Sequence, residues 1–131
     1  MFSLIISIIA IALVIVLAGA SLYYGGDAFN KGTAKGEAAK LVNEAQQLQA
    51  AYTMYKVDNA GAEPALADFN GGEYLSVTLA DWAFTAPTDG APAEVTQAIT
   101  SADVCTEIAD INDQVSCDAS GTAPFTVTYE F

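Results

Sequence analysis

The chain has 131 residues with 4 basic and 16 acidic side chains, a formal net charge of -12 and no histidine. The length is that of one domain, and apolar residues at 53% exclude a disordered acidic chain. The lack of histidine excludes Ser–His and Cys–His nucleophiles and histidine metal ligands. Four lysines and no arginine are also poorly suited to gripping nucleic acid through its phosphates.

Residues 1–26 carry no charged side chain, and 13 of the first 17 are Leu, Ile, Val, Phe or Met. At about 2 kcal/mol for each large apolar side chain, exposing this run to water would cost about 26 kcal/mol. That exceeds the stability of a typical domain. We therefore expect the run to lie in a bilayer or in the core of an assembly, and its length suits a membrane-spanning helix.

Two simpler interpretations of the run compete with assembly. Ala18-Gly19-Ala20 resembles the cleavage site of a secretory signal, but no Lys or Arg precedes the apolar run. The run from Met1 is also part of the molecule, so we expect it to be retained. A single-span membrane anchor stays open, although anchors usually carry flanking positive charge. The lack of flanking positive charge would be explained if a basic leader had preceded Met1 and been removed.

Residues 27–57 contain all four lysines and predict the amphipathic second half of one long helix. Apolar residues recur at alternating steps of four and three, which is the spacing of a narrow helical seam. We expect the seam to pack on the domain that follows it. Its residues are Ala34, Ala38, Leu41, Ala45, Leu48, Tyr52 and Tyr55.

Five of the ten glycines fall between residues 19 and 36, with no proline among them. Each glycine inside a helix weakens it by about 1 kcal/mol relative to alanine. The sequence therefore predicts a stretch around Gly19, Gly25 and Gly26 where the helix can loosen. Small residues also allow neighbouring helices to approach closely in membranes, and that alternative stays open.

Residues 58–131 form an acidic head with 13 acidic side chains and no basic one. Asn59-Ala60-Gly61 is predicted to end the long helix, and Gly71-Gly72 to form a turn. We expect a strand over residues 74–79, with Trp82 and Phe84 in the core beside it, and a short helix over residues 92–100.

The end of the head has the clearest local patterns. A helix is predicted over residues 101–112, with Ser101 as its N-cap and Asp103 in its first turn. Phe125, Val127 and Tyr129 alternate with polar residues, which predicts a strand with one buried face.

The two cysteines, Cys105 and Cys117, predict a disulfide because the hydrophobic start of the chain indicates export. Free thiols or half of a metal site would lack a partner histidine or a further cysteine. The acids Asp110, Asp113 and Asp118, with Asn112, lack the spacing of a calcium loop. We expect no catalytic site, no metal site and no cofactor.

The order of these features resembles a mature type IV pilin. Residues 36–55 are similar to the second half of the long helix of type IVb pilins. The resemblance implies an α+β fold in which a long N-terminal helix packs on a small antiparallel-sheet head with one C-terminal disulfide. The filament core would be formed by the apolar residues Met1, Phe2, Leu4, Ile5, Ile6, Ile8, Ile9, Ile11, Leu13, Val14, Ile15, Val16 and Leu17.

Two positions depart from the family pattern. Most major pilins have Glu at the fifth mature position, where this chain has Ile5, and the proline common near position 22 in type IVa pilins is replaced by Leu22. A missing glutamate is also seen in minor pilins.

The resemblance implies a non-enzymatic structural subunit that polymerises into an extracellular type IV pilus. Its partners would be copies of itself, the inner membrane before assembly and the pilus assembly machinery, with no nucleic acid along the shaft. N-terminal methylation and a role in cell adhesion belong to the same expectation. The alternatives are a membrane-anchored pseudopilin or minor pilin of a secretion system, or an archaeal-type pilin.

Overall fold

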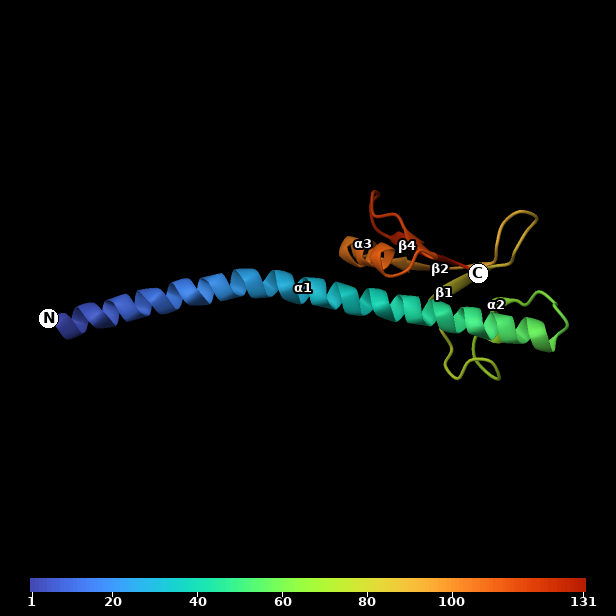
Figure 1. Cartoon of the computed structure of the whole chain (residues 1–131), viewed down its shortest axis with the longest axis horizontal. Helices are drawn as coiled ribbons and strands as arrows, with labels where there is room; N and C mark the ends of the chain where they lie inside the picture. The colour runs from blue at the N-terminus through green and yellow to red at the C-terminus, as the bar shows by residue number, and fades with distance from the viewer. The chain divides into compact units, whose positions relative to one another are not determined.

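The computed structural model describes all 131 residues (Figure 1). Two compact units divide between Thr33 and Ala34, and helix α1 runs through both. We call Met1–Thr33 the N-terminal unit and Ala34–Phe131 the folded unit. The elements are α1 (Phe2–Asp58), α2 (Leu66–Phe69), β1 (Trp82–Thr85), β2 (Glu94–Ile99), α3 (Ala102–Ile111), β3 (Val115–Cys117) and β4 (Phe125–Glu130).

The predicted fold class is confirmed. Four antiparallel strands form one sheet in the order β1-β2-β4-β3. The part of α1 that belongs to the folded unit packs on this sheet through buried seam residues. A disulfide joins Cys105 to Cys117, so the architecture is α+β and pilin-like.

The C-terminal end of α1 lies where the sequence predicts it. The helix ends at Asp58, and Ala60 and Gly61 follow with φ values of 54° and 85°. The left-handed conformation lets the Gly61 N–H return to the Lys56 carbonyl at 2.7 Å. This contact satisfies one of the carbonyls that every helix leaves free at its C-terminal end.

Strand β4 lies in the interior of the sheet, between β2 and β3. Phe125, Val127 and Tyr129 are buried, and the residues between them are exposed or half-buried, as the alternating pattern predicts. The last strand of the chain therefore supplies the central row of the core. Trp82 on β1 is buried in the same core and Phe84 packs against that core, so both predicted core residues are confirmed.

The strand predicted over residues 74–79 is wrong, because that segment is a loop. Gly71 and Gly72 turn the chain with positive φ values. The Asn70 side chain then binds both backbone groups of Leu79, accepting from its N–H at 2.8 Å and donating to its carbonyl at 2.7 Å. These bonds fold the loop back on itself, while Leu75 is buried in the core.

The short helix predicted over residues 92–100 is also wrong. Residues Glu94–Ile99 form β2, which pairs with β1 on one side and with β4 on the other. Val95, Thr96 and Ile99 are β-branched and suit a strand. Pairing along both edges satisfies the backbone N–H and C=O groups of β2, and this outweighs the weak local preference for a helix.

The helix predicted over residues 101–112 is confirmed as α3. The Ser101 hydroxyl oxygen accepts from the Val104 N–H at 3.4 Å and caps the helix. Cys105 in α3 bonds to Cys117 in β3, with Cα atoms 5.4 Å apart. The predicted disulfide is therefore present, and it joins α3 to the edge strand of the sheet.

Candidate functional site

The N-terminal unit presents an apolar surface that nothing in this chain covers. Every residue of Met1–Thr33 is exposed. All 13 apolar residues predicted to form a filament core are exposed, from 53% at Ile5 to 103% at Met1. Exposed apolar patches of this extent mark surfaces that bind a membrane or another protein. The apolar run is therefore the first candidate for a functional surface.

The hydroxyls of Ser7, inside the run, and of Ser21, just beyond it, are compatible with burial. The Ser7 hydroxyl donates to the Ser3 carbonyl, and the Ser21 hydroxyl donates to the Leu17 carbonyl, both at 2.8 Å. A buried hydroxyl without a partner is costly, whereas these hydroxyls are satisfied within the helix. Helix α1 is also long and apolar enough near its N-terminus to cross a membrane.

The three glycines predicted to loosen the helix are helical in this structure. A Cβ atom added at Gly19, Gly25 or Gly26 would meet no other atom of the chain within 4 Å. Contacts within the chain therefore do not explain why these positions are glycine. Loosening of the helix and close packing of a neighbouring copy both stay predictions.

The seam fixes the second half of α1 to the sheet. Ala45 and Leu48 are completely buried, Tyr52 is 7% exposed, and Tyr55 is partly buried against the same core. The Tyr129 hydroxyl of β4 also donates to Gln49 Oε1 at 2.9 Å. The helix is thus held in the folded unit by both apolar burial and a hydrogen bond across the core.

Two further contacts of α1 were not predicted from the sequence. Glu44 accepts a hydrogen bond from the Trp82 indole N–H at 3.1 Å and pairs with Lys40 at 3.4 Å. Glu44 occupies an ordinary position on a helix rich in Gln and Ala, and Trp82 lies 38 residues away. No local signal connects them, because tertiary packing brings them together.

The second contact is a network at the end of α1. Lys56 Nζ lies 2.6 Å from Glu63 Oε1, and the Tyr52 hydroxyl donates to Glu63 Oε2 at 2.8 Å. The Lys56 ammonium donates the hydrogen bond that chiefly lowers the pKa of the Glu63 carboxyl. The same bond raises the pKa of Lys56, while burial is the main cause of the raised pKa of Tyr52.

The distribution of charge separates the two units. The N-terminal unit holds one acidic and one basic side chain, Asp27 and Lys31, which pair at 3.4 Å on the helix surface. The folded unit holds the other 15 acidic and three basic side chains. Copies of the folded unit therefore repel one another strongly in water of low ionic strength.

Comparisons with protein-family models, with curated proteins and with solved structures find no match. The class of the protein therefore rests on its architecture. A long helix with an exposed apolar N-terminal half, a four-stranded antiparallel sheet and a C-terminal disulfide together form a pilin-like fold.

Proposed function

We propose that this chain is a structural subunit that polymerises into an extracellular filament of the type IV pilus kind. One observation carries the proposal. The 13 large apolar side chains of residues 1–17 are all exposed in a protein whose residues 34–131 form a compact folded unit. Copies that bundle these helices would remove the apolar surface from water, which is the dominant favourable term in protein association.

The same surface suits storage of the subunit in a bilayer before assembly. A helix that is apolar on all sides stays buried when it passes from lipid into a bundle of similar helices. The proposal therefore includes the inner membrane as the location of the unassembled chain, and the assembly machinery and other copies as its partners. It assigns no catalysis, and the acidic head disfavours nucleic acid along the shaft.

A membrane-anchored pseudopilin is the second candidate, because the helix is long and apolar enough to span a bilayer on its own. Both candidates use the same helix. They differ in whether copies of the chain form long filaments, which an assembly experiment decides.

The test begins with the full chain purified in detergent. Dialysis to remove the detergent should give filaments in negative-stain electron micrographs. Ile9→Asp places a carboxylate in the middle of the apolar run and should abolish filaments, because a buried unpaired charge costs several kcal/mol. Thr88→Asp adds the same charge at an exposed position of the folded unit and should assemble normally.

Amorphous aggregates or stable monomers of the wild-type chain would contradict the proposal and favour the pseudopilin. Normal filaments from Ile9→Asp would show that the apolar run is not the assembly surface.

A further inference from the structure

Six charged side chains lie on α1 within the folded unit, and all of them are turned toward the rest of that unit. They are Lys35, Glu37, Lys40, Glu44, Lys56 and Asp58. Lys35 and Lys56 form ion pairs with acids outside the helix, and Glu44 accepts from the Trp82 indole N–H. Burial, and next the charge of Asp58, raise the pKa of Tyr74, so Asp58 lies near that ring.

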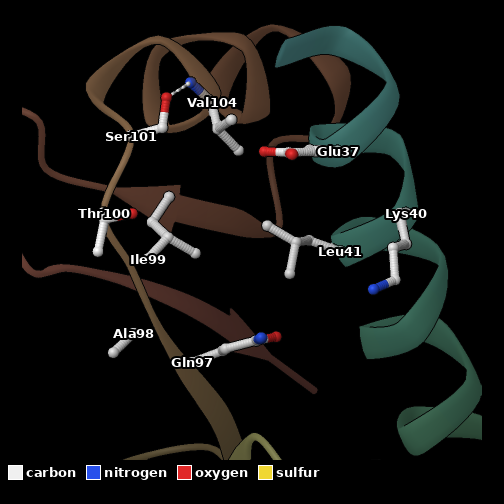
Figure 2. Close-up of a pocket in the computed structure, with 9 residues that line it drawn as sticks. All are labelled: Glu37, Lys40, Leu41, Gln97, Ala98, Ile99, Thr100, Ser101 and Val104. Atoms are coloured by element: carbon white, nitrogen blue, oxygen red, sulfur yellow. Dashed lines mark hydrogen bonds between the residues drawn. The ribbon is translucent and has the colours of Figure 1, made fainter. Parts of the chain in front are cut away.

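The other two, Glu37 and Lys40, line a pocket of about 290 Å³ between α1, the end of β2 and the start of α3 (Figure 2). Leu41 of the helix, with Ile99 and Val104 opposite it, supplies the apolar walls. Figure 2 shows both charged side chains on the pocket side of the helix. The charges in this part of α1 are therefore directed toward the sheet and α3.

The side of α1 that points away from the sheet carries no charge over about six turns. We call it the outward face, and it consists of nine exposed residues: Gly36, Ala39, Asn43, Gln46, Gln47, Ala50, Thr53, Met54 and Val57. These residues recur at steps of three and four, on the side opposite the buried seam.

Such a face is unusual for a helix surface that only meets water. An amphipathic helix normally presents charged as well as polar residues to solvent, and this chain has 16 acidic side chains. On the outward face, by contrast, Met54 and Val57 are 55% and 76% exposed. Protein interfaces are depleted of charge at their centres and enriched in methionine, so the outward face has the composition of an interface.

Lipid is poorly suited to cover the outward face. The 26 residues without charged side chains at the start of the chain already suffice to cross a bilayer as a helix. The outward face belongs to the folded unit, where its flanks carry Lys35, Glu37 and Lys40, and charges are costly inside a bilayer. A protein surface, in contrast, can cover the amide and small side chains and leave the flanking charges in water.

The apolar run of a second copy matches the outward face in length and chemistry. The run of residues 1–17 is about 25 Å long, and the face from Gly36 to Val57 is about 32 Å long. No side chain of the run is charged, so its contact with the face buries no unpaired charge. The run is exposed on all sides of its helix and therefore needs cover beyond that given by a single neighbour.

Other elongated surfaces of the folded unit are acidic. On the sheet, Glu94 and Glu130 lie opposite each other in neighbouring strands. Helix α3 adds three acidic residues, which are Asp103, Glu107 and Asp110. An apolar helix that covered either surface would bury carboxylates, whereas the outward face presents none.

We propose that the apolar run of one copy lies along the outward face of the next copy. The inference rests on the proposed function and adds a second contact to the packing of the runs on one another. The contact joins two different surfaces, so the copies at the two ends of a row still offer a free run and a free face. Head-to-tail contacts of this kind give open filaments when the rotation between copies does not close a ring.

Photo-cross-linking tests which surface covers the outward face. Full-length chain labelled with ¹⁵N and carrying a diazirine analogue of methionine at position 54 is assembled into filaments with unlabelled wild-type chain. After irradiation, mass spectrometry of tryptic peptides should find position 54 joined to residues 1–17 of the unlabelled chain. The same analogue in place of Ala109, at an exposed position of α3, should give no such link.

Wild-type filaments in the same preparation separate this inference from the proposed function. If filaments form but position 54 is linked to the folded unit of another copy, or to detergent alone, the run is not the occupant and the polymer stands. Equal links from positions 54 and 109 would also overturn the contact. A wild-type chain that forms no filaments would overturn both proposals.

The critical concentration for assembly provides the second test. Ala50→Glu places a carboxylate in the middle of the outward face and should raise this concentration at least about tenfold, because the contact would bury the charge unpaired. Gln46→Glu, which alters the charge with little change of shape, should act in the same direction. Ala109→Glu makes the first substitution at an exposed position of α3 and should stay within about twofold of the wild type.

Equal critical concentrations for Ala50→Glu and Ala109→Glu would overturn the proposal. Both positions are exposed in the folded unit, so neither change should alter thermal unfolding in micelles. Normal assembly of Gln46→Glu together with Ala50→Glu would likewise show that the outward face stays in water.

Discussion

Tyr52, Lys56 and Glu63 form the network that binds the end of α1 to the loop after it. Its stability should depend on pH through Glu63, whose pKa lies below the usual 4.5 because Lys56 donates to the carboxylate. A carboxyl with a lowered pKa contributes its full stability above 4.5 and loses it as the pH falls through the lowered value. The pKa of Lys56 is raised above 10.5, so the stability that this lysine contributes is present below 10.5 and is lost as the pH rises through the raised value.

We therefore predict that Glu63→Gln has a smaller loss of thermal stability than the wild type when the pH falls below 4.5. Circular dichroism of the full chain in micelles measures the unfolding temperature across this range. Asp89→Asn, at an exposed turn between β1 and β2, serves as the control and should follow the wild type. Parallel curves for Glu63→Gln and the wild type would show that the network does not contribute.

Leu48 tests how strongly α1 is held by the sheet. Its side chain is completely buried, so Leu48→Ala should reduce the free energy of unfolding by about 2–5 kcal/mol. Gln47→Ala, at the exposed neighbouring position, should change it by less than about 0.5 kcal/mol. Urea unfolding followed by Trp82 fluorescence measures both. Equal effects at the two positions would contradict the burial of the seam.

Helix α1 combines residues of high helix propensity with glycines near its middle. Gly25→Ala with Gly26→Ala should stabilise the helix by about 1 kcal/mol per site, because the added Cβ atoms meet nothing within the chain. Higher helicity and a higher melting temperature in micelles would follow. If the glycines serve close packing between copies, the same variant should also assemble poorly. Unchanged helicity would contradict the predicted loosening.

The elements differ in how well the sequence predicts them. The β4 strand and the α3 helix follow local rules, namely alternation of Phe125, Val127 and Tyr129 and capping by Ser101. The β2 strand does not, since Gln97 interrupts its inward apolar row. Its identity comes from pairing with two other strands, which no local pattern of residues 92–100 contains.

The candidate surfaces differ in the same way. The apolar run of residues 1–17 is evident from composition alone, because no contact with another part of the chain is needed to recognise it. The pocket is formed by residues 37–41 of α1 and 97–104 of β2 and α3. Those segments meet only in the folded unit, so the pocket is a property of the tertiary structure.

For the molecule as a whole, the net charge of -12 opposes assembly while the apolar run favours it. Salt shortens the Debye length from about 8 Å at physiological ionic strength to about 3 Å at 1 M. We predict that filament yield, measured by sedimentation, rises with sodium chloride over this range. A yield that is independent of salt would show that repulsion between the heads does not limit assembly.

The central claim is that copies of this chain form a filament through the apolar run. Electron microscopy of material sheared from cells that make the protein, with mass spectrometry of its main band, tests it most directly. The account predicts filaments composed chiefly of this chain. A chain that remains in the membrane fraction, with no filament containing it, would contradict the account and identify the helix as an anchor.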